Sequence, residues 1–192
     1  MAEFTFGFDD PSRFAHSPYY NDSHFAWREQ LRKFVDTEIM PYAAEWDEAG
    51  GIPDALRKKA SEFGLLRMGY PEEYGGISEG LDRFHSIITT EELSRPGTGG
   101  LASSLMIHGI GLPPIIAIGS EEMKQRIAPE VLAGDKVIAL GITEPSGGSD
   151  VANIHTKCVR DGDHYVINGQ KTLISSGMRA DYVTLAVRTG AP

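Results

Sequence analysis

The chain has 192 residues, of which 41% are hydrophobic and 23% charged, and its formal net charge is −9. This is an ordinary globular composition, and the acidic balance argues against non-specific nucleic-acid binding, which depends on clustered Lys and Arg. No apolar run approaches the roughly 18 residues of a membrane span. The acidic, aromatic N-terminus fits neither a secretory signal nor an Arg-rich transit peptide, so a cytoplasmic protein is expected.

Residues 21–134 are predicted to form an all-helical domain, preceded by an irregular arm over residues 1–20. Residues 21–23 supply three good N-cap types, and apolar residues then recur at helical spacing. Further helices are expected over 42–48, from Asp54 to Gly64, and over 80–95, 101–108, 113–118 and 121–131. The helix near 80–95 is expected to turn four apolar side chains inward: Phe84, Ile87, Ile88 and Leu93.

Residues 135–192 are predicted to begin a β domain, because the apolar spacing changes there from helical to strand-like. Strands are expected over 137–142, 156–160, 164–168, 171–174 and 182–188. Turns at 161–163 and 168–169 favour antiparallel hairpins, and one apolar face of this barrel-like unit is expected to pack against the helices. The predicted fold class is therefore α+β. The single cysteine, Cys158, excludes an internal disulfide.

A buried strand at 137–142 runs into the turn T-E-P-S-G-G-S-D at 143–150. Gly147 and Gly148 lack Cβ bulk, so the backbone can approach a ligand closely, and successive amides in such a turn can bind an anion. A plain surface turn is the alternative, because Ser and Thr commonly hydrogen-bond local backbone.

Two motifs give the chain a resemblance to a known family. Residues 143–150 resemble the T-E-P-x-x-G-S-D signature of acyl-CoA dehydrogenases, and residues 167–177, I-N-G-Q-K-T-L-I-S-S-G, resemble the second flavin motif of that family. Residues 64–76, ending in P-E-E-Y-G-G, are similar to a loop of its N-terminal domain. Family subunits continue through more strands and a C-terminal four-helix bundle, so this chain is expected to be the first half of a subunit.

The resemblance implies FAD-dependent α,β-desaturation of an acyl-CoA thioester, in which a carboxylate removes an α-proton and a hydride passes to flavin N5. In the family the base is a glutamate on a C-terminal helix, so no catalytic residue is assigned in this chain. The chain by itself is expected to be inactive and to retain FAD poorly. The implied partners are acyl-CoA, electron-transfer flavoprotein or a similar acceptor, and further copies of the subunit in a dimer or tetramer.

The same resemblance implies which residues contact the flavin. The strand end at 140–143 would lie along the isoalloxazine, Ser149 would approach the pyrophosphate and the acyl-CoA entrance, and Ser175 would sit near N5 and O4. The implied cofactor-binding set is Leu140, Ile142, Thr143, Gly148, Ser149, Leu173, Ile174 and Ser175, with Ser149 also binding substrate. Leu173 stands where the family usually places Trp or Phe, so aromatic stacking is lost there.

Two other functions fit the same residues. Oxygen-using flavoenzymes of the same fold, nitroalkane-oxidase-like or flavin-monooxygenase-like, share these motifs, and a non-catalytic truncated chain would leave the FAD pocket incomplete. The six histidines show no metal-ligand spacing and no H-E-x-x-H occurs, so no metal site is expected.

Overall fold

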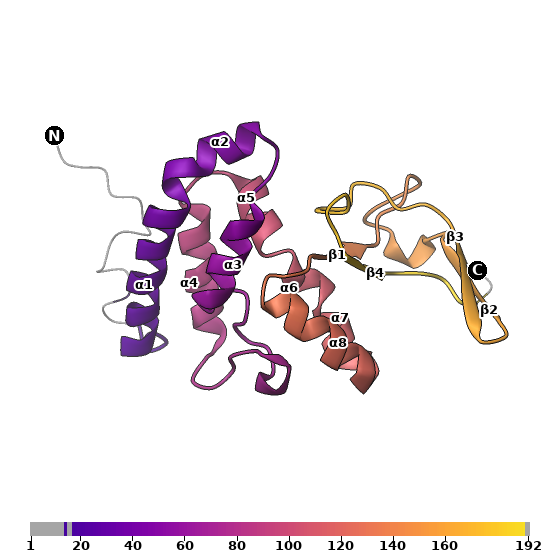
Figure 1. The fold of residues 1–192 in the computed structure, drawn as a ribbon, viewed down its shortest axis with the longest axis horizontal. Coiled ribbons are helices and arrows are strands. Elements are labelled where there is room, and N and C mark those ends of the chain that lie inside the picture. The colour runs from indigo at the N-terminus through magenta and orange to yellow at the C-terminus, as the bar shows by residue number, and fades with distance from the viewer. Residues whose placement is uncertain (1–13, 15–16, 191–192) are drawn as a thin grey trace. The chain divides into compact units, whose positions relative to one another are not determined.

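The computed structural model describes Phe14 and residues 17–190. Helices joined by short loops extend as far as Leu132, and short strands follow (Figure 1). This order confirms the expected α+β class. The irregular arm expected over residues 1–20 lies largely outside the described residues.

The first of two compact units consists of the chain up to Ile52 and of Ser78–Ala102. Its elements are α1 (Asp22–Glu38), η2 (Met40–Tyr42), α2 (Ala43–Glu48), α4 (Arg83–Ser94) and the start of α5 (Gly99–Leu105). Figure 1 shows α1 and α4 side by side. They run in the same direction, because His24 contacts Asp82 where both begin and Asp36 pairs with Arg95 where both end.

Both of these helices begin with side-chain caps. Asn21 Oδ1 accepts a backbone hydrogen bond of 2.9 Å within α1, and Asp82 Oδ1 does the same within α4. The third residue of each helix, His24 or His85, reaches back to the N-cap amide and completes a capping box. The helix start expected at residues 21–23 is confirmed.

The second unit consists of Pro53–Ile77 and the described chain from Ser103 onward. Its helical elements are α3 (Asp54–Glu62), η3 (Glu72–Tyr74), α6 (His108–Gly111), α7 (Pro113–Ile118), α8 (Glu121–Leu132) and η4 (Val151–Asn153). The apolar side of α8 packs against Tyr74, Leu112 and Ile138 in one buried cluster. Within the described ranges no single helix has the length and apolar character to cross a membrane; only a bent pair, Gly99–Leu105 with His108–Ile118, passes that test jointly.

The strands of the second unit form two separate pairs. β2 (Lys157–Asp161) and β3 (His164–Asn168) make an antiparallel hairpin, as expected, around a turn in which Gly162 has φ 60°. β1 (Ile138–Gly141) pairs with β4 (Tyr182–Leu185), and this pairing is parallel. The expectation of an entirely antiparallel unit is therefore wrong for β1 and β4. A long connection containing the hairpin joins these two strands, and parallel pairing requires such a crossover.

The strand expected over 171–174 does not form. Leu173 has φ 55°, which is left-handed backbone that cannot continue a strand. Two residues earlier, Lys171 turns inward and donates to the carbonyl of Ile142 (2.8 Å). This segment is irregular because its contacts are made by a side chain and by single amides, with no ladder of backbone hydrogen bonds.

His108, at the start of α6, is only 4% exposed. Burial, reinforced by the nearby charge of Arg57, lowers the pKa of His108 to about 4, so the folded chain keeps this ring neutral above that pH. In an unfolded chain histidine ionises near pH 6.5. The stability that comes from a neutral His108 is therefore fully present above about pH 6.5 and is lost as the pH falls from 6.5 to 4.

We expect this effect to lower the free energy of unfolding by roughly 3 kcal/mol between pH 7 and pH 4. His108→Gln should remove that part of the pH dependence, because glutamine does not ionise. Urea unfolding followed by circular dichroism at both pH values measures the difference. His164→Gln, at an exposed position, is the control. The same pH dependence in His108→Gln as in the parent chain would contradict the assignment.

Candidate functional site

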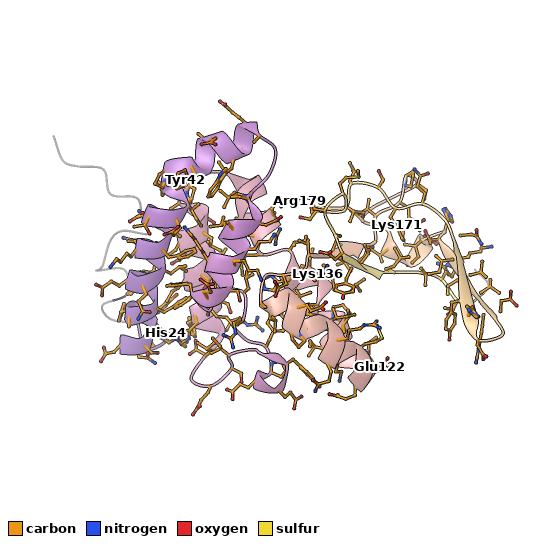
Figure 2. The ribbon with its side chains drawn as sticks, in the orientation of Figure 1. His24, Tyr42, Glu122, Lys136, Lys171 and Arg179 are labelled. Atoms are coloured by element: carbon orange, nitrogen blue, oxygen red, sulfur yellow. The ribbon has the colours of Figure 1, made fainter. Side chains whose placement is uncertain are left out.

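The two motif segments meet at the C-terminal end of β1. The Thr172 amide donates to the Thr143 carbonyl (2.9 Å), and Lys171 Nζ donates both to the Ile142 carbonyl and to Glu144 Oε1, each at 2.8 Å. Figure 2 labels Lys171 among the side chains near β1. The first motif supplies the acceptors and the second supplies the donors. Segments far apart in the chain therefore form one local structure.

A buried ion pair holds this structure together. The side chains of Glu144 and Lys171 are only 4% and 9% exposed. Glu144 also accepts from the backbone amides of His155 (2.5 Å) and Thr156 (2.8 Å). Lys171, helped by these amides, holds the pKa of Glu144 well below its usual range. Glu144 is therefore a fixed anion that ties both motifs to the start of β2.

Two glycines lie where the backbone passes so close to other atoms that a Cβ would collide with them. A Cβ at Gly169 would overlap Thr156, and a Cβ at Gly141 would lie 2.9 Å from a methyl of Leu185. Gly147 lies at the open side of its turn, where a Cβ would meet nothing within 4 Å. The close approach of a ligand to this turn stays a prediction from its glycines.

An open pocket of about 540 Å³ lies beside β1 and β4. Its lining includes Gly141, Lys171, Leu173, Ile174, Met178 and Leu185. Leu173 is 89% exposed and Met178 fully exposed.

The structure brings some of the predicted site residues together and leaves others apart. Leu173 and Ile174 line the pocket, and the half-buried Leu140, Ile142 and Thr143 lie where β1 ends. The remaining three are exposed in the two loops: Gly148, Ser149 and Ser175. Among the described hydrogen bonds none joins Ser149 to Ser175, so their expected place in one site stays a prediction.

Backbone strain marks the second loop. Leu173 and Ser176 have φ values of 55° and 59°, a region that residues other than glycine seldom adopt. Such strain persists where the surrounding contacts fix the chain, and it gathers at binding sites. Here Lys171 and Thr172 provide those contacts on one side, and Arg179 N donates to the Ser176 carbonyl (2.9 Å) on the other.

Sequence reasoning missed Glu144 and Lys171 as the residues that organise the site. Both lie inside the motifs, but only residues facing the ligand were singled out. The available signal was that each is a charged residue next to a half-buried apolar segment, which calls for a buried partner. The pairing of Glu144 with Lys171 became clear only from the fold.

The chain matches known proteins along almost its entire length. Models of the acyl-CoA dehydrogenase N-terminal and middle domains match residues 21–135 and 139–192. Acyl-CoA dehydrogenase apdG of Emericella nidulans is 36% identical over 92% of this chain and 44% of its own length. A probable acyl-CoA dehydrogenase from Mycobacterium abscessus is 47% identical with a TM-score of 0.84, covering 90% of this chain and 46% of that one.

A glutaryl-CoA dehydrogenase from Mycobacterium smegmatis, solved in complex with FADH2, has a TM-score of 0.83 and 30% identity. The match covers 94% of this chain and 45% of that structure. This chain therefore spans about half the length of the relatives it matches.

Proposed function

This chain belongs to the acyl-CoA dehydrogenase family, and on that premise we propose that it contributes one wall of the cofactor site in FAD-dependent desaturation of an acyl-CoA thioester. The observation that carries the proposal is the meeting of the two motifs around one apolar pocket at the end of β1. When bound, FAD supplies the acceptor for the hydride that leaves the β-carbon. The boundary at residues 134/135 between a helical and a β domain is part of the same proposal.

The pocket fits the flavin group on chemical grounds. A flavin ring has apolar faces and polar edges, and the pocket combines exposed Leu173 and Met178 with the backbone at the end of β1. Leu173 in place of an aromatic residue offers contact without stacking. Thr143 would supply a hydroxyl at the pyrimidine edge, and Gly148 and Ser149 would face the pyrophosphate.

Ser175 is the residue proposed to act on the reaction itself. Its exposed position in the strained loop leaves its hydroxyl and amide available to donate to the polar edge of the cofactor. A donor held there stabilises negative charge that develops during hydride transfer. No residue of this chain is proposed as the base, and acyl-CoA, an electron-transfer flavoprotein and subunit copies are the proposed partners.

We expect Ser175→Ala to slow flavin reduction about 100-fold, because one lost donor to developing charge has that effect in comparable sites. Acyl-CoA binding should change little, since the donor acts mainly in the transition state. Stopped-flow reduction of the FAD-loaded protein measures the rate, and Ser176→Ala in the same turn is the matched control. An unchanged rate in Ser175→Ala with FAD still bound would remove Ser175 from the site.

The reaction type is tested on the longest natural polypeptide that contains residues 1–192. After FAD is loaded, anaerobic mixing with acyl-CoA esters of different chain lengths should bleach the flavin absorbance and give the enoyl-CoA. Admission of oxygen then separates the two flavoenzyme classes: slow reoxidation supports a dehydrogenase, whereas rapid reoxidation with peroxide or an oxygenated product supports an oxidase or monooxygenase. FAD that binds but is reduced by no acyl-CoA would contradict the proposed function.

A further inference from the structure

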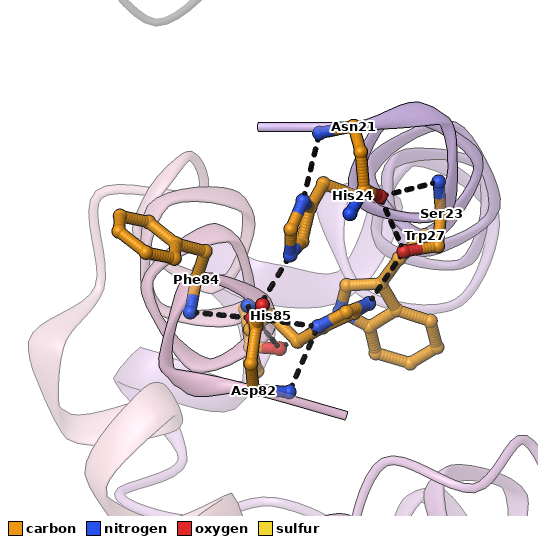
Figure 3. Close-up of polar contacts among 8 residues, drawn as sticks. Asn21, Ser23, His24, Trp27, Asp82, Phe84 and His85 are labelled. Atoms are coloured by element: carbon orange, nitrogen blue, oxygen red, sulfur yellow. Dashed lines mark hydrogen bonds and ion pairs between the residues drawn. The ribbon is translucent and has the colours of Figure 1, made fainter. Parts of the chain in front are cut away.

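The N-termini of α1 and α4 share an uncommon capping arrangement, and they lie side by side (Figure 3). In a capping box the third helical residue is usually Glu or Gln. Both of these boxes use histidine, His24 with Asn21 and His85 with Asp82. A histidine adds something that glutamine lacks, because a second ring nitrogen remains to bind another group.

One ring nitrogen of each histidine lies close to one carboxylate oxygen: in His24 it is the second nitrogen, Nε2, and in His85 it is the capping nitrogen, Nδ1. His24 Nε2 lies 2.9 Å from Asp82 Oδ1, and His85 Nδ1 lies 3.0 Å from the same oxygen. The two rings are 4.3 Å apart, and one potential ligand atom from each of the three residues falls within 4.8 Å of the others. His24 and His85 are buried, whereas the Asp82 side chain is 50% exposed, so the cluster opens to water on one side.

Two imidazoles and one carboxylate are a donor set that suits divalent ions at the end of the first transition series. At metal–ligand distances of about 2.0–2.1 Å, tetrahedral ligands lie roughly 3.3 Å apart, so the oxygen–nitrogen separations need to open by only a few tenths of an ångström. Water can take the fourth position on the exposed side of Asp82. We propose that His24, Asp82 and His85 bind one divalent ion of the zinc class, meaning Zn²⁺, Co²⁺ or Ni²⁺.

The charge of Asp82 supports this donor set. Asp82 Oδ1 lies 2.9 Å from His24 Nε2 and accepts from the backbone amides of Phe84 (2.9 Å) and His85 (3.3 Å). Its carboxylate supplies the one negative charge in the cluster. Two buried imidazoles beside a carboxylate are a combination that binds divalent metal ions in proteins.

Binding has a defined structural consequence at α1. His24 Nδ1 accepts from the Asn21 amide (3.0 Å), so the ring proton sits on Nε2. A metal ion at Nε2 moves that proton to Nδ1, which can no longer accept, and the Asn21 amide loses its partner. At α4, His85 Nδ1 similarly gives up its bond from the Asp82 amide (3.2 Å). The ion thus replaces capping bonds in both helices.

The test uses metal-free protein comprising the whole chain, titrated with Co²⁺ and then with Zn²⁺. We expect one Co²⁺ per chain with the visible absorption of a tetrahedral site, displaced by one Zn²⁺. Amide hydrogen exchange at Asn21 and Asp82 should become faster when the ion binds, although the protein as a whole is stabilised.

Three variants remove a ligand and keep the helix caps. His24→Gln and His85→Gln place the usual capping-box residue at the third position, and Asp82→Asn keeps an equally good N-cap. Each should weaken Co²⁺ binding at least about tenfold, whereas His164→Gln, on the exposed face of β3, should not. Absence of saturable one-to-one binding in the parent chain, or parent-like binding in His24→Gln and His85→Gln, would overturn the proposal.

Discussion

Replacing Lys171 by Met is expected to lower the free energy of unfolding by about 3–5 kcal/mol, the usual cost of removing one partner from a buried ion pair. Glu144 would remain 4% exposed with no cation beside it. Its two backbone amide donors cannot replace a full charge. The Ile142 carbonyl would lose its lysine partner as well.

The double variant Glu144→Gln with Lys171→Met separates the charge effect from packing. It should recover much of the lost stability, because a neutral amide still accepts from the two backbone amides and no buried charge is left unpaired. Lys157→Met, an exposed lysine on β2, is the control. Urea unfolding followed by circular dichroism gives the free energy of unfolding of the parent chain and of the three variants. A free energy for Lys171→Met within about 1 kcal/mol of the parent value would contradict the assigned role of the ion pair.

The Lys171 variant also bears on the site. Lys171 fixes the start of the strained loop that carries Leu173 and Ser175, so its removal should loosen one wall of the pocket. In the longest natural polypeptide that contains residues 1–192, FAD retention after gel filtration is then expected to fall in Lys171→Met and to be partly restored in the double variant. The loop thus links a stability measurement to the proposed function.

Local signals in the sequence were sufficient for several elements. The cap at Asn21, the helix expected over 121–131 and the hairpin around Gly162 depend only on neighbouring residues, and all three are confirmed. The parallel pairing of β1 with β4 could not be predicted in this way. It depends on two strands that the whole hairpin separates, and no turn residue records which strand lies beside which.

In the candidate site, too, features that depend on neighbouring residues could be predicted, whereas contacts between distant residues could not. The motifs located the loops that contain Thr143 and Ser175, but spacing along the chain did not show that Glu144 would meet Lys171. The histidines are a second example, since His24 and His85 lie far apart in sequence and come together only because α1 and α4 begin side by side.

Helix α4 shows why an apolar pattern can mislead. Of the four side chains expected to face inward, Ile88 and Leu93 are buried, whereas Ile87 is 39% exposed. Fully buried positions on this helix include Glu92, which a hydrophobic pattern assigns to solvent. The face that packs on α1 is partly polar, because arginines on α1 provide partners for the carboxylate.

Glu92 therefore makes the second large contribution to stability, and Glu92→Gln is expected to cost about 3 kcal/mol. Its carboxylate accepts from Arg28 (3.1 Å) and twice from Arg32 (2.8 and 3.0 Å). Neutralising it removes the charge that Arg28 and Arg32 share, although Arg28 keeps its ion pair with Glu91. The side chains of these arginines are only 12% and 30% exposed. That partial exposure places the cost at the low end for buried pairs, because the arginines can still reach water.

Glu91→Gln is the matched control, because Glu91 pairs with Arg28 at the same interface and Arg28 keeps Glu92 as a second partner. It should cost less than Glu92→Gln, because Arg28 is not left without a carboxylate. Both tryptophans of the chain, Trp27 and Trp46, lie on α1 and α2, so their fluorescence during urea unfolding reports on this unit. Because Trp27 Nε1 donates to Thr89 on α4 (3.0 Å), loss of the α1–α4 contact should change the signal directly. Equal costs for the two variants would mean that the fully buried carboxylate of Glu92 contributes no more than the ion pair between Glu91 and Arg28.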